Sequence, residues 1–179
     1  MFKKIILFFA FIAACCNVNA QTGAKEVKPS VEQTTVKQFQ YLAVHDSGDI
    51  QNIGTKLGFC YGQIMEVMGK ENLKQSGPVF AIYYSESSTN FDFDAAIPVT
   101  GKMSDMNNVQ SKVMSETKAV VVHYYGPYEG TPAGHEMASK YIMENNLTMT
   151  GLVWEEYVTD PGVEKDPGKW LTNIYYSIK

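Results

Sequence analysis

Two kinds of periodicity divide the chain from about residue 38 onward into helices and strands. Apolar side chains recur at spacings of three and four over residues 50–70 and 131–145, which is typical of helices that bury one face. Short runs rich in β-branched and aromatic residues predict strands at 39–45, 77–85, 91–99, 109–114, 118–125, 152–159 and 171–178. The pattern therefore predicts an α+β domain with more strand than helix.

The order of these elements repeats once along the chain. Val44-His45-Asp46-Ser47-Gly48 returns as Val122-His123-Tyr124-Tyr125-Gly126, and Val122 stands 78 positions after Val44. A period this long, present only twice, indicates duplicated βαββ halves rather than a solenoid. We expect halves at about 38–99 and 109–178, related by a pseudo-two-fold axis, that form one antiparallel sheet with two helices on one face. The boundary between two such halves is a common place for a small-ligand site.

Three glycines follow one another at steps of four on the first predicted helix. Gly54, Gly58 and Gly62 would therefore line one side of that helix. We expect this side to pack closely against the sheet, where a side chain would not fit. The alternative is a ligand that approaches the bare helix backbone.

The first 20 residues have the pattern of a signal peptide. Lys3 and Lys4 precede an apolar run of ten residues, and small residues precede a cut after Ala20. The run is too short to span a bilayer as a helix. The sequence around Cys15 also fits a lipobox, so the alternative to a soluble periplasmic or secreted protein is a lipoprotein anchored through Cys15.

The segment after the signal peptide is polar and has no sustained periodicity. We expect residues 21–37 to be a flexible linker, which leaves residues 38–179 as one folded domain. Cleavage after Ala20 would leave Cys60 as the sole cysteine, so an intrachain disulfide is not expected.

Charge and composition exclude several classes of ligand. The formal net charge is −4, and all 15 basic residues are lysines because the sequence contains no arginine. A chain without the guanidinium fork is poorly suited to phosphates and base edges, so neither a nucleic acid nor an anionic molecule is expected as a partner. His45, His123 and His135 lack the spacing of metal ligands, and we expect no metal and no cofactor.

The strand predicted at 152–159 contains two adjacent acids, Glu155 and Glu156. Alternate residues of a strand face opposite sides, so one of the two must point inward or into a cleft. The repeat aligns Glu155 with Ala81 and Glu156 with Ile82. We expect the Ile82 side to be the apolar, helix-covered face, which would leave Glu155 beside an aromatic cleft. The alternative is that both glutamates lie on a solvated sheet surface.

Several motifs in the second half resemble those of a known family. Tyr125-Gly126-Pro127-Tyr128-Glu129, then Glu155-Glu156-Tyr157 with Asp160-Pro161, then Leu171-Thr172-Asn173-Ile174-Tyr175 are similar to the G-P-Y-E, E-x-Y and T-x-I-Y signatures of the GyrI-like family. This family is the effector-binding domain also found on AraC-type and MerR-type regulators. The match runs over about residues 38–179 in the family's order. The resemblance implies an SHS2-like duplicated fold in a standalone, exported, bacterial protein.

The resemblance also implies where a ligand would bind. In that family a groove lined by aromatic side chains places the glutamate of the E-x-Y strand against cationic ligands. The matching residues are Glu155 for the acid, with Tyr157, Tyr83 and Tyr175 in the surrounding wall. One position departs from the family's pattern, because Ser177 stands where a proline is usual after the last strand's Ile/Val position. The shape of one sheet edge is therefore expected to differ.

Residues and resemblance together predict a small-molecule-binding module for aromatic or lipophilic cationic compounds. A carboxylate among aromatic rings holds such a cation by charge pairing and by cation–π attraction of about 0.5–2 kcal/mol per ring. The alternative is a hydrolase of reactive small molecules with Glu155 as general base, since some standalone members of the family hydrolyse cyclopropane-bearing compounds. A gyrase-inhibitor-like role is disfavoured, because export separates the protein from DNA gyrase. Membrane contact is expected only through lipidation at Cys15.

Overall fold

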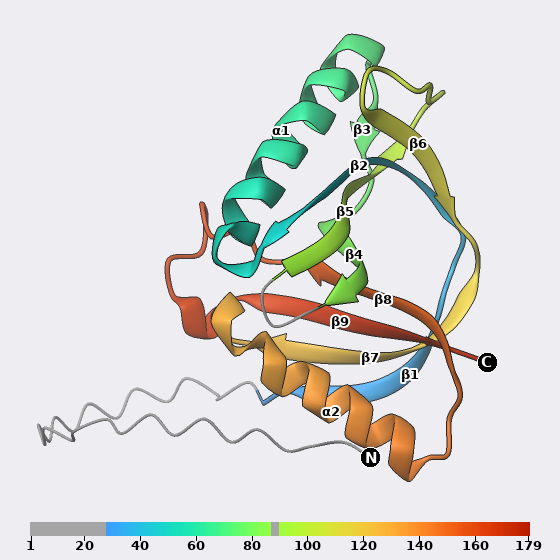
Figure 1. Ribbon diagram of the computed structural model, residues 1–179, viewed down its shortest axis with the longest axis vertical. Coiled ribbons are helices and arrows are strands. Elements are labelled where there is room, and N and C mark those ends of the chain that lie inside the picture. The colour runs from blue at the N-terminus through green and yellow to red at the C-terminus, as the bar shows by residue number, and fades with distance from the viewer. Residues whose placement is uncertain (1–27, 87–89) are drawn as a thin grey trace, which may run out of the picture.

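The computed structural model describes residues 28–86 and 90–179 (Figure 1). Its helices are α1 (Ile53–Glu71) and α2 (Thr131–Glu144). Its strands are β1 (Ser30–Val36), β2 (Phe39–Asp49), β3 (Lys74–Gln75), β4 (Val79–Glu86), β5 (Asn90–Thr100), β6 (Val109–Met114), β7 (Thr117–Tyr125), β8 (Met149–Tyr157) and β9 (Leu171–Ile178). Short 3₁₀ turns occupy Ile50–Asn52, Tyr128–Gly130 and Pro167–Lys169. The predicted signal peptide and residues 21–27 of the predicted linker lie outside the described residues.

The strands form one antiparallel sheet that confirms the predicted duplication. Their order is β1-β7-β9-β8-β4-β5-β2-β6, with β3 beside β5. The first half contributes β2-β5-β4 and the second contributes β7-β9-β8, so the two halves meet at β4 and β8. Ala81 pairs with Glu155 across this central boundary. These two residues are also equivalent in the repeat, so the pseudo-two-fold axis passes close to them.

Two pairs of consecutive strands, β1–β2 and β6–β7, each form one long, bent ribbon, and these ribbons close the sheet on itself. β1 and β2 are separated only by Lys37 and Gln38, and their partners β7 and β6 are separated only by residues 115–116. The pairing keeps one register through the break, with Val36 opposite Thr117 and Phe39 opposite Met114. Figure 1 shows both ribbons curving side by side from the first half of the sheet to the second. The sheet therefore has an outer face and an enclosed inner face.

The prediction of a linker through residue 37 is wrong for residues 30–36. These residues form β1, which pairs along its whole length with β7. Most of its side chains are polar and partly or fully exposed, so the segment lacks the apolar alternation that marks a strand with one buried face. Backbone hydrogen bonding to β7 fixes this edge strand instead.

Both helices cover the outer face, as predicted. The buried side of α1 carries Leu57, Cys60, Ile64 and Val67, which pack against β2, β4 and β5. α2 packs on β7 and β9, where Gly134 lies so close to Ile174 that an added Cβ would be 2.5 Å from its Cδ1 atom. The helix begins at Thr131, directly after Gly130, with Pro132 in its first turn.

The expectation about which face of β4 is covered by a helix is wrong. Phe80 and Ile82 do not lie under a helix, because they belong to the apolar cluster of the inner face together with Tyr41, Met114 and Trp154. The opposite wall of the curled sheet buries them instead. Sequence alone did not reveal this, since both faces of β4 carry apolar residues.

The glycines of α1 are also placed differently from the expectation. Gly54, Gly58 and Gly62 are exposed, and an added Cβ at any of them would meet no atom within 4 Å. They lie on the side of α1 that turns away from the sheet, because the four buried residues already occupy the packing side.

Candidate functional site

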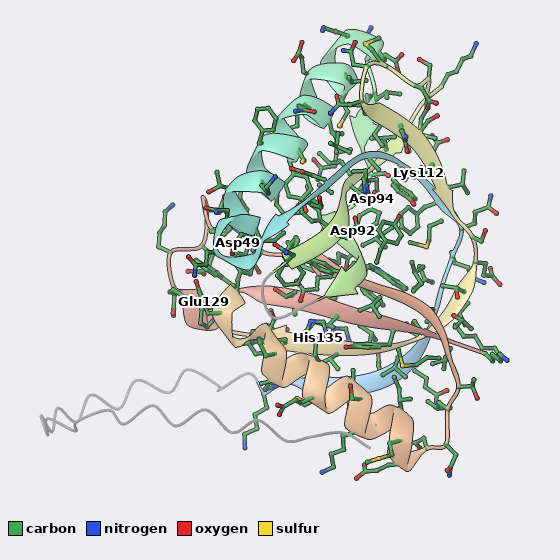
Figure 2. The ribbon with its side chains drawn as sticks, in the orientation of Figure 1. Asp49, Asp92, Asp94, Lys112, Glu129 and His135 are labelled. Carbon is green, nitrogen blue, oxygen red and sulfur yellow. The ribbon has the colours of Figure 1, made fainter. Side chains whose placement is uncertain are left out.

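Glu155 occupies the centre of the outer face, in the region that lies between the two helices. It is on β8, with Ala81 of β4 on one side and Ile174 of β9 on the other. Only 8% of its side chain is exposed. Both helices reach toward it, α1 with Tyr61 and α2 with His135, and Figure 2 shows His135 on the side of α2 that faces the sheet.

A chain of hydrogen-bonded side chains passes through Glu155. His135 Nε2 lies 2.8 Å from Glu155 Oε1, and Tyr157 Oη donates to Glu155 Oε2 at 2.9 Å. The chain continues at both ends, with Tyr176 Oη 2.7 Å from His135 Nδ1 and Tyr83 Oη 2.9 Å from Tyr157 Oη. We call Glu155, His135, Tyr157, Tyr83 and Tyr176 the Glu155 cluster.

The charge of Glu155 fixes the direction of these hydrogen bonds. An ionised carboxylate only accepts, so His135 Nε2–H and the Tyr157 hydroxyl must donate to it. Because Tyr157 gives its proton to the carboxylate, it accepts from Tyr83. Burial, followed by the negative charge of Glu155, raises the pKa of Tyr157 well above its ordinary value. Tyr157 therefore stays protonated and remains a donor across the physiological pH range.

Further aromatic side chains surround the Glu155 cluster. Tyr61 of α1 donates its hydroxyl to the Phe80 carbonyl at 3.1 Å. Tyr128 contacts the Tyr157 ring at a centroid distance of 5.5 Å and the Trp170 ring at 5.1 Å. Burial raises the pKa of Tyr61 and of Tyr128, and the charge of Glu155 adds to this effect in both. The carboxylate therefore places a negative field among several phenol rings.

The structure brings together three of the four predicted site residues. Glu155, Tyr157 and Tyr83 belong to one hydrogen-bonded chain. Tyr175 does not join them, because it lies on the inner face. There its ring stacks on Trp154 at 4.6 Å, and its hydroxyl donates to Glu156 Oε2 at 3.4 Å.

The sequence interpretation missed His135, Tyr176, Tyr61 and Tyr128. The register of β8 against β9 decides between the adjacent tyrosines, because Glu155 pairs with Ile174 and so shares its face with Tyr176. His135 could have been found from the predicted second helix, on which it follows the buried Gly134 and lies one turn before Ala138, which is also buried.

A second polar centre occupies the inner face at β5. Asp94 is fully buried and accepts hydrogen bonds from Lys112 Nζ at 2.6 Å and from Tyr84 Oη at 2.7 Å. His45 Nδ1 lies 3.0 Å from its other oxygen. Figure 2 labels Asp92 and Asp94 on β5 and Lys112 on β6, and β2 lies between these two strands in the sheet. The charge of Asp94 is therefore balanced by a lysine, in contrast to that of Glu155.

The second half repeats this arrangement with different chemistry. His123 Nδ1 lies 2.7 Å from Asn173 Oδ1, just as His45 faces Asp94. Asn173 Nδ2 in turn donates to Glu156 Oε2 at 2.8 Å. Asn173 replaces the aspartate of the first half, and Glu156 supplies the carboxylate from the neighbouring strand.

The described residues contain neither a metal-ligand cluster nor a membrane-spanning helix. Within residues 28–86 and 90–179, no three His, Cys, Asp or Glu side chains come together as a metal site would require. In the same part of the chain, no helix combines the length and apolar character needed to cross a membrane.

Several solved structures of differently named proteins have the same fold. The C-terminal domain of EcmrR superposes with a TM-score of 0.75 at 17% identity, covering 86% of this chain and 99% of that one. In the EcmrR–DNA complex, this chain spans only 57% of the EcmrR chain, with a TM-score of 0.76 and 18% identity. SAV2435 bound to tetraphenylphosphonium gives 0.62 at 14% identity, covering 84% of this chain and 94% of that one. A hydrolase from Listeria innocua gives 0.61 at 14% identity, covering 83% and 91%.

Structural likeness at these sequence identities establishes the fold alone. A comparison with curated proteins gave no match. The model of one protein family, described as GyrI-like small molecule binding domain, matches residues 29–179. The match includes β1 and extends to the last residue. The chain therefore belongs to the GyrI-like small molecule binding domain family.

Proposed function

We propose that this protein binds aromatic, lipophilic cations at the Glu155 cluster. The observation that carries the proposal is a nearly buried carboxylate that has aromatic neighbours but no lysine partner. Among the described residues, the only ion-pair partner of Glu155 is His135, which carries a charge only when protonated. With a neutral imidazole, the carboxylate charge is uncompensated inside a region of low dielectric.

The tyrosines around Glu155 add to the preference of its negative charge for cations. Tyr61, Tyr128 and Tyr157 all have pKa values raised by burial and further raised by the negative charge of Glu155. Their rings offer electron-rich faces, each worth about 0.5–2 kcal/mol to a cation. A ligand with a delocalised positive charge and several rings would gain from both effects. It would not need to displace His135 or Tyr157 from the carboxylate.

A protein of the same fold supports the ligand class. SAV2435 is described as bound to tetraphenylphosphonium, which is a cation surrounded by four aromatic rings. The likeness to SAV2435 establishes the fold alone, so the transfer of this ligand class to the present chain is part of the proposal.

A hydrolase is the second candidate function. Glu155 between a histidine and a tyrosine has partners that could hold it as a general base, and one structural neighbour is described as a hydrolase from Listeria innocua. As a hydrolase, the protein would use the Glu155 carboxylate to activate a water molecule, which would attack a neutral, reactive substrate. The two candidates differ in what the Glu155 charge does.

The two adjacent glutamates provide a matched test. Isothermal titration with tetraphenylphosphonium should show that Glu155→Gln weakens binding by about 1–3 kcal/mol, as expected for the loss of a charged partner. Glu156→Gln should change the affinity little, because Glu156 lies on the inner face with Asn173. Triphenylphosphine oxide, a neutral analogue, should bind the original protein and Glu155→Gln alike. Equal effects of the two substitutions would remove the proposal, and turnover of a neutral substrate abolished only by Glu155→Gln would favour the hydrolase.

A further inference from the structure

We propose a second small-molecule site on the inner face of the sheet, which takes neutral amphipathic compounds that carry a hydrogen-bond acceptor. A cavity of about 300 Å³ opens on this face. Its apolar and aromatic wall is formed by Tyr41, Ile82, Tyr84, Val113, Met114 and Leu152. This volume is at the lower end of the range for ligand pockets in proteins, so it suits a compact molecule with one or two rings.

The cavity is separate from the Glu155 cluster. Ile82 lines the cavity and pairs with Trp154, whereas Ala81 pairs with Glu155. Neighbouring residues of a strand face opposite sides, so the sheet itself stands between the two sites. A ligand in one site does not touch the other, and the second site does not depend on the proposed function of the first.

Local irregularities of the sheet keep this space open. The register of β8 against β9 shifts between Met149 and Val153, so the strands are not regularly paired there. Ser177 bridges the gap, because its hydroxyl accepts from Leu152 N and donates to Leu152 O, both at 2.9 Å. This serine stands where the first half has Pro98. The irregular wall is therefore held by hydrogen bonds and leaves no backbone group of Leu152 unsatisfied.

The Tyr41 hydroxyl supplies the polar contact for a ligand. Tyr41 lines the cavity, and only 5% of the residue is exposed. Burial, and after it the charge of Asp94, raises its pKa to about 12, so the hydroxyl remains protonated. Tyr84 also lines the cavity, but its hydroxyl donates to Asp94. The protonated Tyr41 hydroxyl is a hydrogen-bond donor, and an acceptor on the ligand would accept from it.

The charges around the cavity favour a neutral ligand. Glu116, at the edge of the cavity, pairs with Lys37 at 3.0 Å. Asp94, behind Tyr84, pairs with Lys112 at 2.6 Å. Each acid therefore has its own cation, and no excess charge remains to attract an ion. The Glu155 cluster differs, because its carboxylate has no lysine partner among the described residues.

Prodan, a neutral naphthyl ketone whose emission shifts to the blue in apolar surroundings, is a suitable probe. Titration of the purified protein should give a saturable blue shift that persists with saturating tetraphenylphosphonium. Leu152→Trp should weaken binding at least about tenfold by filling the cavity, because Leu152 packs on the inner face and lines the cavity. Tyr41→Phe should weaken it about fivefold through the loss of one neutral hydrogen bond. The control is Val163→Trp, at an exposed valine that does not line the cavity.

Three results would overturn the proposal. The first is the absence of any saturable shift in the original protein. The second is competition by tetraphenylphosphonium together with a loss of prodan binding in Glu155→Gln, which would place the probe at the Glu155 cluster. The third is equal binding by Leu152→Trp and Val163→Trp. Circular dichroism of each variant confirms that a loss of binding does not arise from unfolding.

Discussion

His135 on α2 lies 2.8 Å from Glu155 on β8, measured from Nε2 to Oε1. This contact connects the second helix to the strand at the centre of the sheet. Both side chains are mostly covered, with 27% of His135 and 8% of Glu155 exposed. The histidine is therefore important for the carboxylate in two ways, as a hydrogen-bond donor and as the group that holds its orientation.

Replacing His135 by leucine should lower the free energy of unfolding by about 1–3 kcal/mol, because it leaves a buried carboxylate oxygen without its donor. Urea unfolding at neutral pH measures this change. Glu136→Leu, at the exposed neighbouring position, is the control and should change stability by less than about 0.5 kcal/mol. Adding Glu155→Leu to His135→Leu should recover part of the loss, since both partners are then apolar. A fully stable His135→Leu protein would contradict a structural role for the contact.

The adjacent tyrosines of β9 should behave differently in cation binding. Tyr176→Phe removes the hydroxyl that contacts His135, so tetraphenylphosphonium should bind about two- to tenfold more weakly. Tyr175→Phe keeps the stacking on Trp154 and lies on the other face, so affinity should remain unchanged. Titration calorimetry of the two variants distinguishes these outcomes. If Tyr175→Phe had the larger effect, the ligand would have to lie on the inner face.

Asp94 should make stability depend on acid pH. Burial alone would raise its pKa, but hydrogen bonds from Lys112 and Tyr84 outweigh burial and hold the pKa below the ordinary value. Such a carboxyl contributes stability above the pKa of an unfolded aspartate, about 3.9, and this contribution is lost as the pH falls through the lower, folded-state pKa. The free energy of unfolding should therefore decrease below about pH 4, and less steeply in Asp94→Asn. Glu136→Gln should keep the original slope, and an identical slope in Asp94→Asn would refute the assignment.

Alanine substitutions at two helix glycines should have opposite signs. Gly62→Ala adds a methyl group to open space on α1, so it should stabilise the protein by about 0.5–1 kcal/mol through helix propensity. Gly134→Ala on α2 places a Cβ 2.5 Å from Ile174 Cδ1, and Ile174 is fully buried. The cost of displacing Ile174 should exceed the gain in helix propensity, so Gly134→Ala should destabilise the protein by about 1 kcal/mol. Thermal unfolding of both variants tests the packing of the two helices.

We predict processing of the N-terminus from the sequence alone. Signal peptidase should cut after Ala20, which gives a mature chain that begins at Gln21. Mass spectrometry of the protein recovered from the host compartment measures the terminus directly. A lipid mass on Cys15 would establish the lipoprotein alternative, and an intact Met1 in a cytoplasmic fraction would exclude export.

The fold could be predicted from the repeat, but the roles of the two faces could not. The spacing of Val44 and Val122 was sufficient to infer two halves in one sheet, because duplicated segments adopt the same structure. Which face of β4 the helix covers depends on the closure of the sheet, and this long-range feature leaves apolar residues on both faces. Phe80 and Ile82 were therefore placed on the wrong side.

The same repeat contained unused information about β1. Val31 stands 78 positions before Val109, so the counterpart of β6 in the first half is β1. At the candidate site, Glu155 and Tyr157 could be chosen from strand alternation and family motifs. His135 and Tyr176 could not, since their approach to Glu155 depends on the packing angle of α2 and on the register of β9.

The continuous ladder of β1–β2 against β6–β7 makes the two halves exchange strands. β1 begins the first repeat but pairs with β7 of the second, and β6 begins the second repeat but pairs with β2 of the first. Neither half therefore contains all the strands of its own sheet, and each would expose unpaired edges if separated. The arrangement is that of a domain swap enclosed within one chain. A chain cut between residues 100 and 108 should yield fragments that are unstable alone and fold only when mixed, as a heterodimer.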